Sequence, residues 1–207
     1  MVKTFLVFVM LSAAKHLGRT IIVGWGLPRR NKLGQRIIIM SEHFEYTVFN
    51  TGWGYFGLAA DKNGLRRTIL PCKNRKIVER QLLKGLETAH FDKNLLKPLQ
   101  KQIIAYFAGK PARFGALLAA NGFSPFTRKV LTACSKIPAG KTVSYSQLAD
   151  MIGNPRASRA VGSALARNPI PLIIPCHRVI HSDGSLGSFS APGGTVLKKM
   201  LLELEKQ

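Results

Sequence analysis

One short stretch in the C-terminal part of the chain constrains it most. Residues 170–174 read Ile-Pro-Leu-Ile-Ile and lead directly into Pro175-Cys176-His177-Arg178. The apolar run has the length and β-branched content of a buried strand, and Pro175, which lacks an N–H, is expected to end it. The thiol would then lie at a strand end, beside cationic groups that lower a thiol pKa. A cysteine in an apolar run is by itself more often a packing residue, so its neighbours carry the functional interpretation.

The charge balance of the chain indicates a polyanionic partner. Lys and Arg number 31 against 10 Asp and Glu, which gives a formal net charge of +21 over 207 residues. The excess is spread over both halves of the chain rather than confined to one tail. A basic surface without a function is the alternative, but so large an excess favours nucleic acid as the partner.

The three cysteines, Cys72, Cys134 and Cys176, are far apart in the sequence. Such spacing argues against a disulfide framework and for a reducing compartment. The spacing of Cys and His also matches no zinc-ligand pattern, so the sequence predicts neither a metal site nor a cofactor.

Residues 40–115 are predicted to form a small α+β domain with an antiparallel sheet. Alternating apolar residues indicate strands, and the Asp-Lys-Asn-Gly segment at 61–64 is a hairpin signal because Asn-Gly tolerates positive φ. Helical periodicity follows. The expected strands are 44–49, 55–60 and 65–70, and the expected helices are 77–86 and 95–107.

Residues 116–207 are predicted to form a second, mostly helical domain, after a Pro- and Gly-rich crossing at 109–122. Ser144 can cap the second of its helices, and Gly153-Asn154-Pro155 makes a tight turn before the third. Two short helices around such a turn indicate a helix-turn-helix, winged-helix-like DNA-binding motif. The expected helices are 126–135, 145–152 and 156–167.

The third helix combines small residues with cations. Its charges are Arg156, Arg159 and Arg167, and most of its other side chains are Ala, Gly or Ser. Small side chains allow a backbone to approach another surface closely, and cations suit phosphates. Tight packing against a neighbouring helix explains the same composition equally well.

Two motifs together resemble one family. Residues 174–180 (Ile-Pro-Cys-His-Arg-Val-Ile) and residues 159–162 (Arg-Ala-Val-Gly) match signatures of the methylated-DNA–protein-cysteine methyltransferases, the O6-alkylguanine-DNA alkyltransferases. The resemblance covers about 124–205 strongly and 40–123 loosely. It implies irreversible transfer of an alkyl group from O6-alkylguanine in double-stranded DNA to the thiolate of Cys176, with O4-alkylthymine as a second lesion. The expected protein is a monomer that flips the damaged nucleotide and acts once per molecule.

The resemblance also assigns roles around Cys176. His177 would take the thiol proton through a bridging water, because adjacent side chains on an extended chain diverge. Glu205, near the end of the last helix, would orient His177, although a solvated helix end is the plain alternative. Asn168 would brace the active-site turn, and Tyr145 would donate to the leaving base, unless it is simply a core aromatic.

Further residues are implied as DNA or base contacts. Arg159 would enter the duplex in place of the flipped nucleotide, through the minor groove. The Ser190 N–H would face the guanine oxygen, and the backbone carbonyls of Cys176 and Val179 would bind the guanine amino group. The remaining expected DNA-binding residues are Arg156, Ala160 and Arg178.

The chain departs from the family pattern beside Ser190. Phe189 replaces a common tyrosine, and Ala191-Pro192 resembles a two-residue insertion. These changes leave the thiol chemistry intact and bear on which alkyl groups fit. Two other functions remain as alternatives. A non-repairing lesion-binding module of the alkyltransferase-like kind would lack Cys176, and a helix-turn-helix regulator would leave the Pro-Cys-His-Arg motif without a role.

Residues 1–39 allow two interpretations. An apolar core at 5–14, followed by cations, with Ser-Ala-Ala at 12–14, has the outline of a secretory signal, although the core is too short to span a bilayer as a helix. Alternatively, Met40 is the true start and residues 1–39 are an upstream extension. The family has no such leader and acts on chromosomal DNA, so we favour the second interpretation and expect no membrane partner and a cytoplasmic protein, or a nuclear one in a eukaryote.

Overall fold

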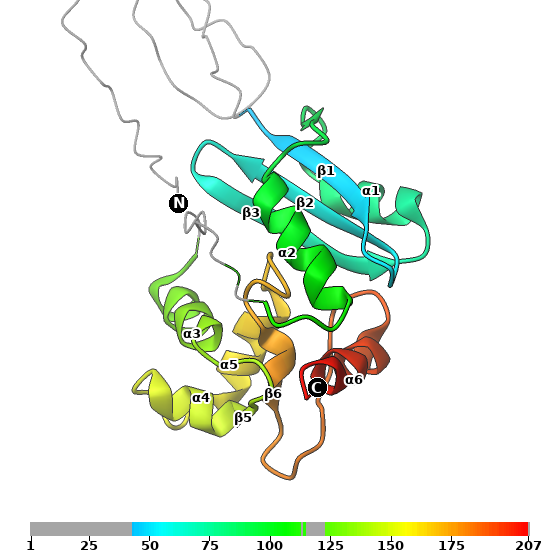
Figure 1. Ribbon diagram of the computed structural model, residues 1–207. Coiled ribbons are helices and arrows are strands. Elements are labelled where there is room, and N and C mark those ends of the chain that lie inside the picture. The colour runs from blue at the N-terminus through cyan, green and yellow to red at the C-terminus, as the bar shows by residue number, and fades with distance from the viewer. Residues whose placement is uncertain (1–42, 113, 115–122, 207) are drawn as a thin grey trace, which may run out of the picture. The chain divides into compact units, whose positions relative to one another are not determined.

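The computed structural model in Figure 1 describes residues 43–112, 114 and 123–206. Both interpretations of residues 1–39 lie outside the described residues, as does most of the crossing predicted at 109–122. Residues 43–207 form one compact unit, and it carries every candidate site residue.

A four-stranded sheet dominates the N-terminal half, by which we mean the described residues 43–112. Its order is β3-β2-β1-β4. The first three strands are antiparallel, and the predicted Asp-Lys-Asn-Gly turn joins β2 to β3. The fourth pairs with β1 in parallel, so the sheet is mixed rather than antiparallel throughout. The strands are β1 (Glu45–Asn50), β2 (Tyr55–Asp61), β3 (Gly64–Cys72) and β4 (His90–Phe91).

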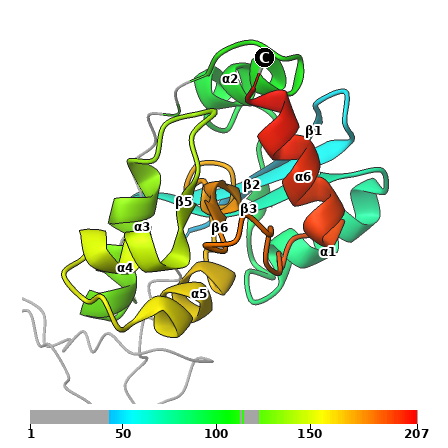
Figure 2. The same cartoon turned by 90° about the horizontal axis from the view of Figure 1, so that it is seen from below.

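The two helices of this half, α1 (Arg75–Leu83) and α2 (Lys97–Phe107), cover opposite faces of the sheet (Figure 2). The alternation along β2 explains the arrangement. Phe56 and Leu58 point into the core cluster that contains the apolar face of α2. Ala59 follows Leu58 in the sequence, so its side chain lies on the other face of the sheet, where it packs with α1 in a second, smaller cluster.

The C-terminal half is mostly helical, as expected. Its helices are α3 (Pro125–Ser135), α4 (Tyr145–Met151), α5 (Ser158–Ala166) and α6 (Gly194–Leu204), and a short parallel pair joins β5 (Val143–Ser144) to β6 (Val179–Ile180). Helices α4 and α5 form the predicted helix-turn-helix. The expected cap is present, because the Ser144 hydroxyl accepts from the Gln147 N–H while the Gln147 side chain accepts from the Ser144 N–H. The α+β fold class is therefore confirmed.

The strand predicted at residues 170–174 is wrong. These residues form a buried turn in which the Ile174 N–H donates to the Ile170 carbonyl at 3.0 Å and Leu172 adopts a left-handed φ of 77°. Pro171 and Pro175 cannot donate to a ladder, so the backbone bonds stay local. The apolar composition reflects burial in the core, which the run shares with β2, α2 and α5.

Candidate active site

Cys176 follows this turn and begins the 3₁₀ turn η1 (Cys176–Arg178), rather than ending a strand. The Asn168 side chain braces the segment before it. Its Nδ2 donates to the Ile174 carbonyl at 2.9 Å and to the Cys176 Sγ at 3.2 Å, and its Oδ1 accepts from the Ile170 N–H at 3.1 Å. One side chain thus ties both ends of the turn and contacts the thiol.

His177 lies in the interior with no exposed surface, next to the carboxylate of Glu205. The His177 Nε2 and the Glu205 Oε1 are 2.9 Å apart. The Nδ1 of the same ring is buried and is the one such side-chain atom without a hydrogen-bond partner in the described part of the chain. A buried polar atom without a partner needs an explanation. One explanation is that this nitrogen accepts a hydrogen bond from a water molecule or from a reacting group.

Glu205 is the C-cap of α6, and it is a buried acceptor rather than a solvated helix end. It accepts from His177, from the Tyr106 hydroxyl at 2.7 Å, from the Gly140 N–H at 3.2 Å and from Arg178. Although burial raises the pKa of Glu205, the bonds from His177 and Arg178 lower it well below its usual range. The carboxylate therefore stays ionised, and a neutral His177 carries its proton on Nε2 and its lone pair on Nδ1.

Arg178 does not fit the predicted role of a DNA contact. Its side chain is buried, and its Nε and Nη2 donate to the two carboxylate oxygens of Glu205 at 2.9 and 2.7 Å. Its Nη1 donates to the Ile137 carbonyl at 2.5 Å. The prediction was wrong because a 3₁₀ turn sends successive side chains in different directions, and Arg178 points to the interior, where it holds Glu205.

Protonation in the site differs from the sequence expectation. Burial raises the pKa of the Cys176 thiol, and the hydrogen bond from Asn168 and the charge of Lys198 offset only part of that effect. The expected lowering of the thiol pKa is therefore not found. Burial lowers the pKa of His177, which keeps the imidazole neutral at neutral pH. A neutral thiol beside a neutral base is the resting arrangement.

Lys198 is a site residue that the sequence analysis missed. Its ammonium is buried and donates to the Val179 carbonyl at 2.7 Å and to the Leu186 carbonyl. Burial lowers the pKa of Lys198 to about 8, while the nearby Cys176 favours the charged form. A signal existed in the sequence, since Lys198 falls on the apolar face of α6 between Leu197 and Leu201.

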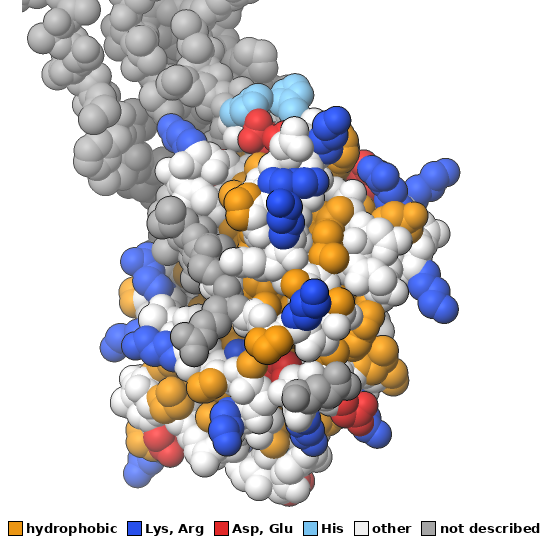
Figure 3. Space-filling model, in the orientation of Figure 1, with side chains coloured by type: hydrophobic (Ala, Val, Ile, Leu, Met, Phe, Trp, Pro, Cys, Tyr) orange, Lys and Arg blue, Asp and Glu red, His pale blue; other side chains and the backbone are white. Residues whose placement is uncertain are grey.

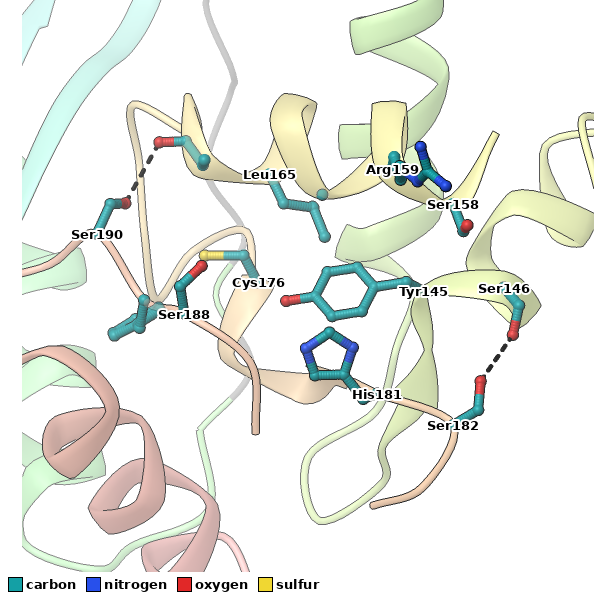
Figure 4. A pocket seen from close by; sticks show the side chains of 13 residues that line it. Tyr145, Ser146, Ser158, Arg159, Leu165, Cys176, His181, Ser182, Ser188 and Ser190 are labelled. Atoms are coloured by element: carbon teal, nitrogen blue, oxygen red, sulfur yellow. Dashed lines mark hydrogen bonds between the residues drawn. The ribbon is translucent and has the colours of Figure 1, made fainter. Parts of the chain in front are cut away.

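A cavity of about 470 Å³ opens beside Cys176, between α4, α5 and the segment 181–190. Figure 4 shows Tyr145 and His181 reaching into the space next to Cys176, with Arg159 at the rim formed by α5. The Tyr145 and His181 ring centroids are 5.1 Å apart. A Cβ on Gly187 would come within 2.9 Å of the Tyr145 hydroxyl, and φ there is +68°, so glycine lets the backbone cover the cavity. His181 was not predicted as a site residue.

Four of the predicted site residues line this cavity, namely Tyr145, Arg159, Cys176 and Ser190. Ser190 lines it and donates from its hydroxyl to the Ala166 carbonyl at 3.3 Å. Arg156 and Ala160 are exposed on the turn before α5 and on α5 itself. Val179 is fully buried, and its carbonyl already accepts from Lys198. A carbonyl oxygen can accept a second bond, so the predicted base contact stays a prediction.

The face of the described residues seen in Figure 3 is rich in basic side chains. Figure 3 shows many Lys and Arg side chains, spread over both halves, and few acidic ones. Within the described ranges, no group of three or more His, Cys, Asp or Glu side chains is placed to bind a metal ion. No described helix is long and apolar enough to cross a bilayer. All three cysteines are free.

Sequence comparisons identify relatives of this chain. A family model described as "6-O-methylguanine DNA methyltransferase, DNA binding domain" matches residues 125–207. A methylated-DNA–protein-cysteine methyltransferase of Methanosarcina acetivorans is 38% identical over 160 residues, which cover 77% of this chain and 97% of the relative. The enzyme of the same name from Mus musculus is 53% identical over 81 residues, 39% of this chain and 38% of that protein.

The comparison with solved structures points to the same family as the sequence comparisons. The crystal structure of Mycobacterium tuberculosis O6-methylguanine methyltransferase has a TM-score of 0.67 at 35% identity, over 79% of this chain and 93% of that one. The crystal structure of Mycobacterium tuberculosis OGT in complex with DNA has a TM-score of 0.65 at 36% identity, over 78% and 92%. The chain belongs to the methylated-DNA–protein-cysteine methyltransferase family.

Proposed function

We propose that this protein repairs alkylated DNA directly, by moving the alkyl group of O6-alkylguanine onto Cys176. One observation carries the assignment to this residue. His177 is clamped through Nε2 to the ionised Glu205, and its buried Nδ1 is left as an unpartnered acceptor one residue from the thiol. That is the arrangement of a general base for a buried nucleophile. The enzyme is a methylated-DNA–[protein]-cysteine S-methyltransferase.

The chemical step follows from these protonation states. The Cys176 proton passes to the His177 Nδ1 through a bridging water, and the resulting thiolate attacks the alkyl carbon. The S–C bond forms as the C–O6 bond breaks, and the bonding pair leaves with guanine, which takes up a proton. The product thioether has no good leaving group, so Cys176 is consumed and each molecule acts once.

Donors around the cavity would lower the barrier by stabilising charge on the leaving guanine. The Tyr145 hydroxyl reaches the space beside Cys176, and burial raises the pKa of Tyr145, so it remains a donor. The Ser190 N–H, which has no backbone partner among the described residues, would face the guanine oxygen. The Val179 carbonyl would accept from the amino group alongside Lys198.

The target atom lies inside the base stack, so the nucleotide must leave the duplex to reach the buried sulfur. Arg159, exposed at the cavity rim, would occupy the space that the nucleotide vacates. Arg156 would bind phosphate, and the small Ala160 would allow α5 to approach the minor groove. We propose that residues 116–207 carry DNA binding and alkyl transfer, with residues 40–115 as a supporting domain. The protein would act as a monomer in the compartment that holds the chromosomal DNA, the cytoplasm or, in a eukaryote, the nucleus.

Stoichiometry tests this function. Incubation with duplex DNA containing O6-methylguanine should transfer one methyl group per protein molecule and then stop, because the thioether cannot be released. The measurement is the amount of methyl group lost from the DNA at several protein-to-DNA ratios. Sustained turnover would rule out a consumed cysteine, and binding without loss of the methyl group would favour a lesion-binding module.

DNA binding should weaken steeply with salt. The chain carries a net charge of +21, and Lys and Arg side chains of the described residues are spread over the face shown in Figure 3. Each neutralised phosphate contributes a slope of about −0.9 in log K against log salt, so a handful of contacts predicts a total slope of roughly −4 to −6. Titration of a labelled duplex at several salt concentrations measures it, and a flat response would contradict nucleic acid as the partner.

A further inference from the structure

The turn that presents Cys176 is attached to the N-terminal half through Thr68. This residue lies on β3, one of the two edge strands of the sheet, and its side chain is buried. Its backbone N–H donates to the Pro169 carbonyl at 2.9 Å, and its hydroxyl donates to the Pro171 carbonyl at 2.8 Å. The free edge of the sheet therefore holds the turn from one side while Asn168 braces it from within.

This attachment acts at a strained position. Leu172, directly after Pro171, has a φ of 77°, a conformation that costs free energy for a residue with a side chain and persists only where the surroundings hold it. The Thr68 hydroxyl fixes the carbonyl next to that residue. Without this hydrogen bond the turn is free to relax. A relaxed turn would change the direction in which the Cys176 sulfur points.

His177, the proposed general base, is linked to the same N-terminal half through Glu205 and Tyr106. Tyr106 is the second to last residue of α2, and it is 4% exposed. Its hydroxyl donates to the Glu205 Oε1, the oxygen that also contacts the His177 Nε2. Burial and the charge of Glu205 raise the pKa of Tyr106, so the phenol stays protonated and remains a donor.

We propose that Thr68 and Tyr106 are positioning residues for the reaction, through which the N-terminal half sets the relative placement of nucleophile and base. Thr68 aligns the turn before Cys176, and Tyr106 fixes the carboxylate that orients His177. The reason is geometric, since a displacement of about 1 Å at a reacting group can reduce a rate by about 100-fold. The inference rests on the proposed function.

The test compares rate with affinity. Thr68→Val removes the hydroxyl while retaining the side-chain shape, and Tyr106→Phe removes only the phenol oxygen. Each should slow methyl transfer at saturating duplex by about 10-fold and leave the duplex Kd within about twofold, since neither residue lies at the cavity rim. Thr68→Ser, which keeps the hydroxyl, should restore most of the rate.

Two control variants separate positioning from stability. Thr51→Val removes a 2.9 Å hydrogen bond from the threonine hydroxyl to the Gly54 carbonyl. Tyr46→Phe removes a 2.8 Å hydrogen bond from the tyrosine hydroxyl to the Glu79 carboxylate. The first bond lies in the loop between β1 and β2, and the second joins β1 to α1, so neither touches the turn before Cys176 or Glu205. These variants should lower the melting temperature by similar amounts and transfer methyl groups at the normal rate.

The inference is overturned if Thr68→Val and Tyr106→Phe react at the wild-type rate, or if Thr68→Ser is as slow as Thr68→Val. It is also overturned if the control variants slow transfer equally, since the loss would then follow stability alone. If the wild-type protein transfers no methyl group, the proposed function itself fails, which is a separate result.

Discussion

A Cys176→Ala variant is expected to transfer no methyl group at all, while it binds methylated duplex DNA with nearly the affinity of the wild-type protein. Transfer requires a bond to the Cys176 sulfur, and alanine offers no nucleophile. Binding depends instead on phosphate contacts by exposed cations, to which a buried thiol contributes little. The two measurements are methyl loss from the duplex and the Kd for the same duplex.

The other two cysteines supply the controls. Cys134→Ala and Cys72→Ala should keep single-turnover transfer, because neither cysteine lines the cavity. Burial raises the pKa of the Cys134 thiol, which keeps it unreactive. Residual transfer by Cys176→Ala, at any rate above that of free methylated DNA in buffer, would contradict the assignment.

An Arg159→Ala variant should slow methyl transfer from duplex DNA by about 10- to 1,000-fold. In the proposed role, Arg159 stabilises only the extruded state of the nucleotide, and unstacking and unpairing a base costs a few kcal/mol. The same variant should react almost normally with free O6-benzylguanine, which has no duplex to leave. Single-turnover rates with both substrates measure the difference.

Two further variants show whether the effect is specific to flipping. Tyr145→Phe should slow the reaction with both substrates, because it removes the hydroxyl proposed to donate to the leaving base. Arg156→Ala, which removes a cation outside the cavity lining, should weaken duplex binding and reduce the salt slope by about 1, without changing the rate with the free base. If Arg159→Ala impairs the free base as much as the duplex, Arg159 supports the pocket and does not assist flipping.

Local signals in the sequence predicted much of the fold. Three local features are found at their predicted positions, and each depends on only a few residues: the Ser144 cap, the Gly153-Asn154-Pro155 turn and the hairpin at 61–64. Helix ends agreed within two or three residues for the same reason. The parallel strand β4 was missed because two residues carry no periodicity.

The turn before Cys176 shows why composition can mislead. Residues 170–174 are as apolar as a central strand, but Pro171 and the left-handed Leu172 prevent a ladder. Apolar content predicted the burial correctly, and the backbone shape followed from hydrogen bonding that only the fold reveals. The 3₁₀ turn that follows this segment directs the Arg178 side chain into the interior, where it donates to Glu205.

The remaining site residues depend on contacts between distant parts of the chain. Tyr106 meets Glu205 across 99 positions, and Thr68 meets Pro171 across 103. No local pattern marks either residue. Lys198 is the exception, since a cation on the apolar face of a helix could have been noticed as a buried charge in need of acceptors.

Transfer of the methyl group to Cys176 can be measured from the masses of the peptides released from the protein after reaction with O6-methylguanine duplex. The peptide containing Cys176 should gain one methyl group in every reacted molecule, while the peptides containing Cys72 and Cys134 should be unchanged. A methyl group on either of the other cysteines, or an unmodified Cys176 after the DNA has lost its methyl group, would contradict transfer to Cys176.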